Sequence, residues 1–231
     1  MSLFTDFSSV RTRARAPFSG LLLASAAVLL SACGSLPDKP QRATLYDFGP
    51  GPLPMAATPA TPAAPAAQRP ALTLPDIEAT GRLDGTQLLY RLGYADPQVL
   101  HAYGQARWSQ APGQLLRQRL RESLSAQRAV LGPDEAASIA RQDGRVPDVL
   151  RISLDEFSHY FQAPQQSTGL VRLRATLLRN GPAGDRVLAQ RSFTVQRPAP
   201  TADAPGGVKA LTAATDAAVA EIMQWIEAAQ R

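Results

Sequence analysis

The only cysteine of this 231-residue chain ends the tetrapeptide Leu30-Ser31-Ala32-Cys33, and its thiol is the side chain best suited to covalent chemistry. The tetrapeptide has the pattern of a bacterial lipobox, in which the cysteine sulfur receives a diacylglyceryl group and signal peptidase II cuts between Ala32 and Cys33. The alkylation requires a thiol, and the small residues before it let the peptidase bind extended backbone. We therefore predict that Cys33 is the lipidated first residue of the mature protein, with a further acyl group such as palmitate on its amine.

The residues before Cys33 have the layout of a secretory signal peptide. Three arginines, Arg11, Arg13 and Arg15, precede an apolar run over residues 18–30. That run is shorter than the roughly twenty residues needed to cross a bilayer, which disfavours a transmembrane helix with an incidental cysteine. We predict a lipoprotein signal peptide over residues 1–32. Gly34, where an inner-membrane lipoprotein of well-studied Gram-negative bacteria has aspartate, favours an outer-membrane anchor with the folded domain in the periplasm.

No other residues form a catalytic or metal-binding pattern. His101 and His159 have no partner at ligand spacing, and we expect each to be an ordinary surface or edge histidine. The chain contains no Gly-x-Ser-x-Gly elbow and no glycine-rich phosphate loop. Two acidic pairs, Asp134-Glu135 and Asp155-Glu156, fit the first turn of a short helical segment and a strand bulge respectively. We therefore expect a protein that is not an enzyme and that binds no cofactor or metal.

Two aromatic–arginine pairs, Tyr90-Arg91 and Arg107-Trp108, have two interpretations. In the first, Tyr90 and Trp108 pack beneath a helix while the arginines stay solvated or form ion pairs. In the second, the four residues line a partner surface or an acyl-chain groove, because aromatic residues and arginine are enriched at interface cores. The sequence leaves both interpretations open.

The segment from Cys33 to Pro70 is rich in proline and alanine and poor in bulky apolar residues, which predicts an extended tether. About 35 such residues in polyproline form would reach on the order of 100 Å. Residues 44–48 interrupt this composition and read as a short strand that docks on the folded domain. The tether proper would then comprise residues 49–70.

Alternating and helical apolar patterns predict one domain over residues 71–231. The expected strands are 72–74, 87–93, 150–161 with a bulge near Asp155-Glu156, 171–178 and 187–195. Amphipathic helices are expected from Pro112 to about Val130 and from about Gly207 to Ala229. These elements predict a two-layer α+β domain, with a largely antiparallel sheet of about five strands covered by two helices.

The charged residues point to no nucleic-acid partner. The formal net charge is +5, and removal of the signal peptide takes away three arginines and one aspartate. No concentrated basic patch is present, so nucleic-acid binding is not expected. With Cys33 lipidated, no thiol remains for a disulfide, and the domain must be stable by packing alone.

Several short motifs resemble the ABC-type transport auxiliary lipoprotein family. They are Tyr46-Asp47-Phe48, Leu88-Leu89-Tyr90-Arg91-Leu92, Tyr94, Tyr103, Ala106-Arg107-Trp108, Ala111-Pro112, Leu115-Leu116, Leu120, Leu124, Arg191-Ser192-Phe193 and Trp225-Ile226. Members include the outer-membrane lipoprotein of the paraquat-inducible lipid-transport system. The resemblance implies partnership with an ABC permease, its ATPase and a protein with mammalian-cell-entry (MCE) domains.

Together, such systems move phospholipid or other hydrophobic molecules between the inner and outer membranes. The ATPase is a separate subunit in these systems, in agreement with the missing phosphate loop. The competing interpretation is a structural or assembly lipoprotein of another envelope complex that transfers no lipid.

Overall fold

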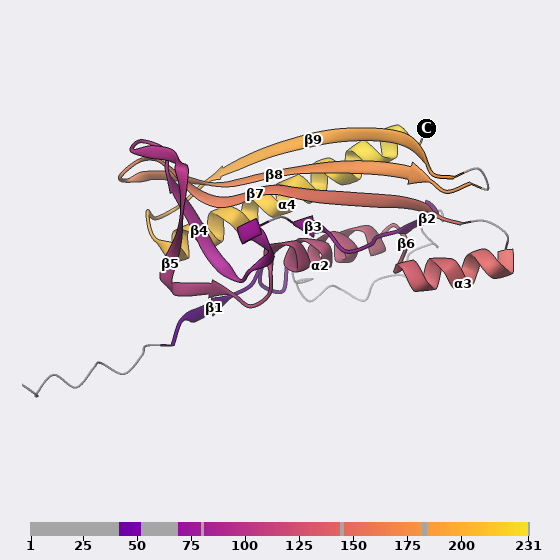
Figure 1. Ribbon diagram of the computed structural model, residues 1–231, viewed down its shortest axis with the longest axis horizontal. Coiled ribbons are helices and arrows are strands. Elements are labelled where there is room, and N and C mark those ends of the chain that lie inside the picture. Colours follow the sequence, from indigo (N-terminus) through magenta and orange to yellow (C-terminus); the bar gives the residue numbers. More distant parts are fainter. Residues whose placement is uncertain (1–41, 52–68, 80, 144–145, 182–183, 231) are drawn as a thin grey trace, which may run out of the picture. The chain divides into compact units, whose positions relative to one another are not determined.

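The computed structural model describes residues 42–51, 69–79, 81–143, 146–181 and 184–230 (Figure 1). The predicted signal peptide, Cys33 and most of the proline-rich segment lie outside these residues. In chain order the elements are β1 (Thr44–Tyr46), β2 (Arg69–Thr73), β3 (Glu78–Ala79), the 3-10 helix η1 (Gly81–Asp84), β4 (Gln87–Leu92), β5 (Asp96–Trp108), α2 (Pro112–Ser125), β6 (Arg128–Leu131), α3 (Pro133–Asp143), β7 (Asp148–Ala163), β8 (Gln166–Arg179), β9 (Arg186–Pro198) and α4 (Ala204–Ala229).

The long strand β7 organises the sheet. On one edge it pairs antiparallel with β8, which pairs antiparallel with β9. On the other edge it pairs parallel with three short strands in succession: β2 at Asp148, β3 at Ser153 and β4 at His159. Beyond β4 lie β5 and then β1, and beyond β2 lies β6.

The α+β class is therefore confirmed, but the predicted sheet is wrong in size and direction. The described residues form nine strands in a mixed sheet rather than about five that are largely antiparallel. The expected strand over residues 72–74 overlaps β2, and the expected docking strand is β1. The sequence analysis missed β3 and β6, which have two and four residues, too few to reveal an alternating pattern. β5 was missed because most of its residues are exposed or only partly buried, so neither face is consistently apolar.

The predicted bulge in β7 is confirmed. Leu154 pairs with Leu173 and Glu156 with Arg172, so Asp155 is an extra residue without its own partner in β8. The inward-facing series therefore changes from Leu150, Ile152 and Leu154 to Phe157, His159 and Phe161. The bulge keeps one face of a 16-residue strand buried along its whole length.

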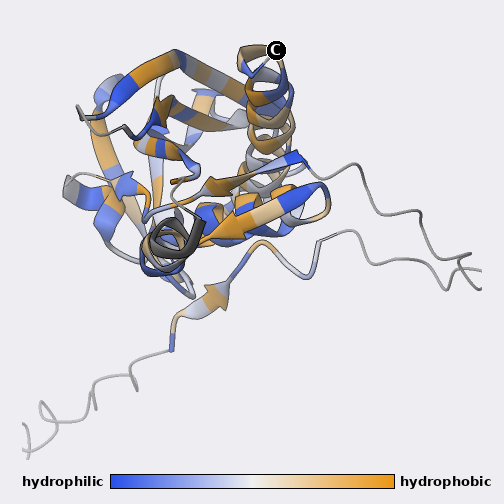
Figure 2. Cartoon of the chain, turned by 90° about the vertical axis from the view of Figure 1, so that its right-hand side faces the viewer, coloured by the Kyte–Doolittle hydropathy of each residue, from blue (hydrophilic) through white to orange (hydrophobic). Residues whose placement is uncertain are grey.

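Helices α2 and α4 cover the inner face of this sheet, and their leucine-rich and alanine-rich stripes join its apolar side chains in one core. Along the strands, hydrophobic and hydrophilic segments alternate (Figure 2), as expected for a sheet with one buried face. Helix α2 ends at Ser125 rather than near Val130, because Arg128–Leu131 pairs with β2 as β6. Helix α4 begins at Ala204, three residues before the predicted start, with Asp203 accepting a hydrogen bond from the Gly206 N–H.

A third helix, α3, contacts the opposite, outer face. Leu72 and Leu74 point into the core, so the intervening Thr73 points to the other side of β2. Thr73 and Val149 line a cavity together with Pro133 and Ala136 of α3. The first turn of α3 carries Asp134 and Glu135, as the sequence predicted.

The close approach of α4 to β8 depends on Gly169. A Cβ at Gly169 would clash with the backbone of Ala210, which cannot move without shifting the helix. We expect Gly169→Ala to lower the free energy of unfolding by about 1–3 kcal/mol, measured by urea denaturation. Gly104→Ala is the matched control, because a Cβ at this strand glycine meets nothing within 4 Å. A change within about 0.5 kcal/mol is expected there, and equal effects of both variants would contradict the prediction.

Candidate functional site

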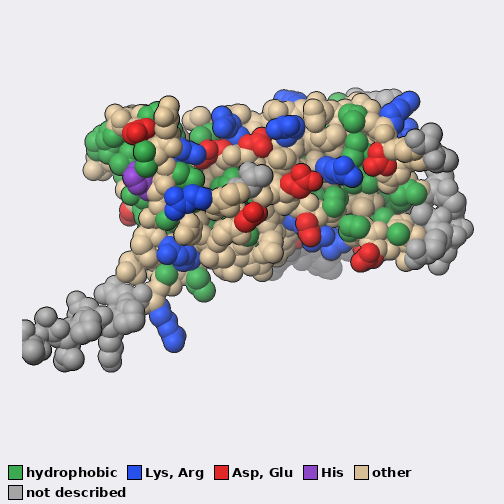
Figure 3. All heavy atoms as spheres, in the orientation of Figure 1, with side chains coloured by type: hydrophobic (Ala, Val, Ile, Leu, Met, Phe, Trp, Pro, Cys, Tyr) green, Lys and Arg blue, Asp and Glu red, His purple; other side chains and the backbone are tan. Residues whose placement is uncertain are grey.

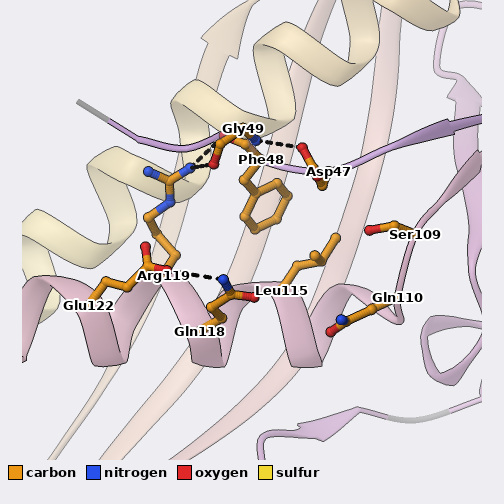
Figure 4. Close-up of a pocket in the computed structure, with 9 residues that line it drawn as sticks. All are labelled: Asp47, Phe48, Gly49, Ser109, Gln110, Leu115, Gln118, Arg119 and Glu122. Atoms are coloured by element: carbon orange, nitrogen blue, oxygen red, sulfur yellow. Dashed lines mark hydrogen bonds between the residues drawn. The ribbon is translucent and has the colours of Figure 1, made fainter. Parts of the chain in front are cut away.

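The segment that leads from the predicted lipid anchor is fixed to the folded domain (Figure 4). Thr44, Leu45 and Tyr46 pair parallel with the end of β5, as predicted for a docking strand. Two residues later Phe48 is inserted into the core, where its ring packs edge-on against Trp108 at a centroid distance of 5.6 Å. Trp108 in turn packs against Phe157 at 5.5 Å. The predicted tether region therefore contributes a strand and a core side chain to the domain.

Arg119 of α2 holds this segment in place. Its side chain is 7% exposed, and its Nη2 donates hydrogen bonds to the carbonyls of Phe48 and Gly49. The same guanidinium forms an ion pair with Asp216 of α4 at 3.5 Å. One buried cation thus joins the N-terminal segment to both inner helices. Gly49, with a φ of 66°, turns the chain directly after Phe48.

A small cavity of about 110 Å³ lies beside this junction, lined by Asp47, Gly49, Gln118 and Arg119 among others. It is smaller than the roughly 300–1,000 Å³ of typical small-molecule sites, and its side chains are mostly polar. The junction therefore connects the N-terminal segment to the two inner helices and offers little room for a small-molecule ligand.

Of the four residues predicted as a partner or lipid surface, Trp108 is buried and the other three make contacts within the domain. Trp108 is 1% exposed, as in the interpretation in which it packs in the core. Arg107 donates hydrogen bonds to the carbonyls of Tyr103 and Ala106 on its own strand. Tyr90 is half-buried and lies against Tyr103 at a centroid distance of 4.7 Å.

Arg91 connects the β4–β5 hairpin to the bulge of β7. Its guanidinium makes paired hydrogen bonds of 3.1 and 3.0 Å to the buried carboxylate of Glu156. It also donates to the carbonyls of Pro97 and Gln98, across the hairpin. Arg91 therefore positions the hairpin, and its role toward a partner stays a prediction.

The tip of this hairpin exposes apolar side chains. Tyr94 is 48% exposed and Val99 42% exposed. In the space-filling view, hydrophobic side chains gather at the end where β4 meets β5 and β7 meets β8, while charges of both signs are interspersed elsewhere on that face (Figures 1 and 3).

A buried hydrogen-bond chain was missed by sequence analysis. His159, expected at the surface or at an edge, is fully buried beneath the N-terminus of α4. Its Nδ1 bonds to the Tyr103 hydroxyl and its Nε2 to Ser167 Oγ, both at 2.8 Å. Desolvation lowers the pKa of His159 to about 4 and raises the pKa of Tyr103. The one sequence feature that could have indicated the burial of His159 is its position between Phe157 and Phe161 in the alternating series that faces the core.

The His159 ring is packed tightly against α4. A Cβ at Gly207 of α4 would already meet the His159 ring. Glu156 faces Arg91, not His159. Among the described residues no group of three or more His, Cys, Asp or Glu side chains is arranged to hold a metal ion. Within that same part of the chain, no helix combines the length and apolar character needed to span a bilayer.

The fold is an α+β domain with a nine-stranded sheet, to which the described N-terminal segment over residues 42–51 is fixed. The chain belongs to the family of ABC-type transport auxiliary lipoprotein components, whose model matches residues 52–223. The recognition made from its short motifs is therefore confirmed.

Two crystal structures share the fold. Protein XCC0632 from Xanthomonas campestris, assigned to family DUF330, is 22% identical over 81% of this chain and 97% of its own, with a TM-score of 0.62. An uncharacterized protein is 15% identical over 80% of this chain and 99% of its own, with a TM-score of 0.55. The comparison with curated proteins found no match.

Removal of the Arg119 guanidinium should release the N-terminal segment. We expect Arg119→Ala to lower the free energy of unfolding by about 1.5–3 kcal/mol, because charged hydrogen bonds to buried carbonyls are lost. Hydrogen–deuterium exchange of residues 42–51 should increase selectively. Arg121→Ala, on the same helix but half-exposed, is the control and should leave that exchange unchanged. Unaltered exchange in Arg119→Ala would show that pairing with β5 alone holds the segment.

Burial of His159 should make stability depend on pH. Between about pH 4 and 6.5 the unfolded chain binds one more proton than the folded chain at this residue. Stability from neutral His159 is therefore present above pH 6.5 and is lost as the pH falls to 4, by up to about 3 kcal/mol. Urea denaturation at several pH values should show that the free energy of unfolding falls less steeply between pH 6.5 and 4 in His159→Gln than in the wild type. His101→Gln, which keeps His159, should retain the wild-type slope; identical slopes in all three proteins would refute the assignment.

Proposed function

We propose that this protein is a non-enzymatic, lipid-anchored auxiliary component of an MCE-type ABC transport system. In this role it resides at the outer membrane with its domain in the periplasm. The system moves phospholipid or another hydrophobic molecule between the two membranes. The observation that carries the proposal is the family match across residues 52–223. Its sequence support is the lipobox that ends at Cys33.

The docked N-terminal segment supports a position close to the membrane. Because β1 belongs to the domain, only about ten residues separate Cys33 from Thr44. At about 3.3–3.6 Å per residue, even a fully extended connection spans roughly 35 Å. Residues 49–70 begin and end on the same folded unit, so they add nothing to this reach. The domain would act as a docking point held near the bilayer rather than as a module on a 100 Å leash.

The hairpin tip is the surface that we assign to a protein partner. Tyr94 and Val99 are exposed there, and Arg91 fixes the hairpin backbone beneath them. Exposed aromatic and aliphatic side chains on a rigid support are typical of interface anchors. ATP hydrolysis would belong to the ATPase subunit, and this lipoprotein would contribute binding and position.

The test is to crosslink membranes, purify the full-length lipidated protein and identify its partners by mass spectrometry. An MCE-domain protein together with an ABC permease and ATPase should be recovered. Tyr94→Ala should reduce that recovery about tenfold or more, as expected for an interface anchor worth about 2 kcal/mol. Val187→Ala is the control, because Val187 is at least as exposed as Tyr94, at 58% against 48%, but lies near the β8–β9 turn. Recovery of unrelated envelope proteins alone would favour a structural lipoprotein without a role in transport.

A further inference from the structure

A cavity of about 470 Å³ lies between α3 and the outer face of the sheet. Its size is within the roughly 300–1,000 Å³ of small-ligand sites. The walls are mainly apolar: Pro133 and Ala136 come from α3, and Val149 comes from β7. Elsewhere the outer face carries arginine, serine and threonine side chains, so this cavity is a local apolar recess in a polar surface.

A buried hydroxyl in the cavity lacks a partner. Thr73 lines the cavity and is 4% exposed, and its Oγ1 makes no hydrogen bond with any described residue. Leaving such a group unpaired is unfavourable, whereas a ligand oxygen next to it would restore the missing hydrogen bond. The Thr73 hydroxyl therefore indicates a ligand with a polar group at this position.

A cationic side chain, Arg151, lines the same cavity. Thr73 pairs with Val149 across β2 and β7, and Arg151 is two residues further along β7 on the same face. The Arg151 side chain is 56% exposed, and within the described part of the chain its ion pair is with Asp185, at 3.8 Å. The nearby Asp148 carboxylate is already engaged by Arg179 through two hydrogen bonds of 3.0 Å. The pair with Asp185 is long and exposed and uses one nitrogen of the guanidinium, so the other donors of Arg151 can bind an anionic group.

We propose that this cavity binds a single acyl chain with an anionic head group. The carboxylate or phosphate lies at Thr73 and Arg151, and the chain lies along Ala136 of α3. The charge of Arg151 favours an anionic amphiphile over a neutral or cationic one, and the apolar walls favour a hydrocarbon tail. The inference deepens the proposed function and rests on it for the biological source of the ligand, but binding itself is tested separately.

The experiment uses the full-length lipidated protein in nanodiscs and two photoactivatable probes that carry a diazirine in the acyl chain. One probe is palmitate and the other is lysophosphatidylglycerol; peptide mapping locates the label. We expect saturable labelling of the peptide that contains Ala136. Labelling by palmitate alone would assign a free fatty acid, and labelling by the lysolipid would assign a phospholipid-derived chain. The proposal would be overturned if neither probe labelled this peptide. It would also be overturned if a cationic alkylammonium probe labelled the peptide as strongly as the anionic probes do.

Two variants separate binding from folding. Arg151→Ala should raise the half-saturating probe concentration about tenfold, equivalent to about 1.4 kcal/mol, while Arg172→Ala, also an exposed arginine on the outer face, should not. Ala136→Trp should abolish labelling by filling the cavity, with an unchanged melting temperature as the folding control. Unchanged labelling in Arg151→Ala would refute the head-group site whether or not Ala136→Trp folds. Transporter subunits recovered from membranes without this labelling would leave the proposed function standing and remove only the cavity site.

Discussion

The extra residue at Asp155 is the constraint on which the rest of the sheet depends. A strand of 16 residues with strict alternation would present the side chains after the bulge to the wrong face. The shift at Asp155 instead turns Phe157, His159 and Phe161 toward the helices, and the strand remains buried on that side throughout. One edge of β7 then accepts β2, β3 and β4 in succession, and the other supports the long β8–β9 hairpin. Glu156, brought beside Arg91 by the same shift, connects the bulge to the β4–β5 hairpin.

Three arginine side chains act as internal connections in this domain. Arg91 joins β4 to β7, and Arg119 joins the N-terminal segment to α2 and α4. Arg128, whose side chain is 1% exposed, bonds to Glu227 and Gln230 and fixes β6 against the end of α4. Guanidinium groups suit this work because their planar donors bind two acceptors at once. These three arginines therefore join elements that are distant in the sequence.

Patterns with long, regular periods were predictable, whereas contacts between distant segments were not. The leucines of α2, the alternation in β7 and β8 and the bulge at Asp155 follow from spacing along the chain. The partners of β1, β3 and β6 depend on which edge of β7 or β5 each short segment reaches, and two to four residues carry too little pattern to specify that. The burial of His159 depends on Gly169 and Gly207, which let α4 approach the sheet. No property of the histidine itself indicates this.

By itself, the sequence determined the predicted anchor at Cys33, the α+β class and the family, because lipobox, periodicity and short motifs are local properties of the chain. Tertiary structure alone decided where the anchor segment joins the domain, since Phe48 and Arg119 meet across about 70 residues. It also decided that Trp108 is buried in the core while Arg91 binds Glu156, and that Thr73 and Arg151 share a cavity with α3. These contacts come from packing and strand order, and strand order is set by competition among edges that only the folded chain brings together.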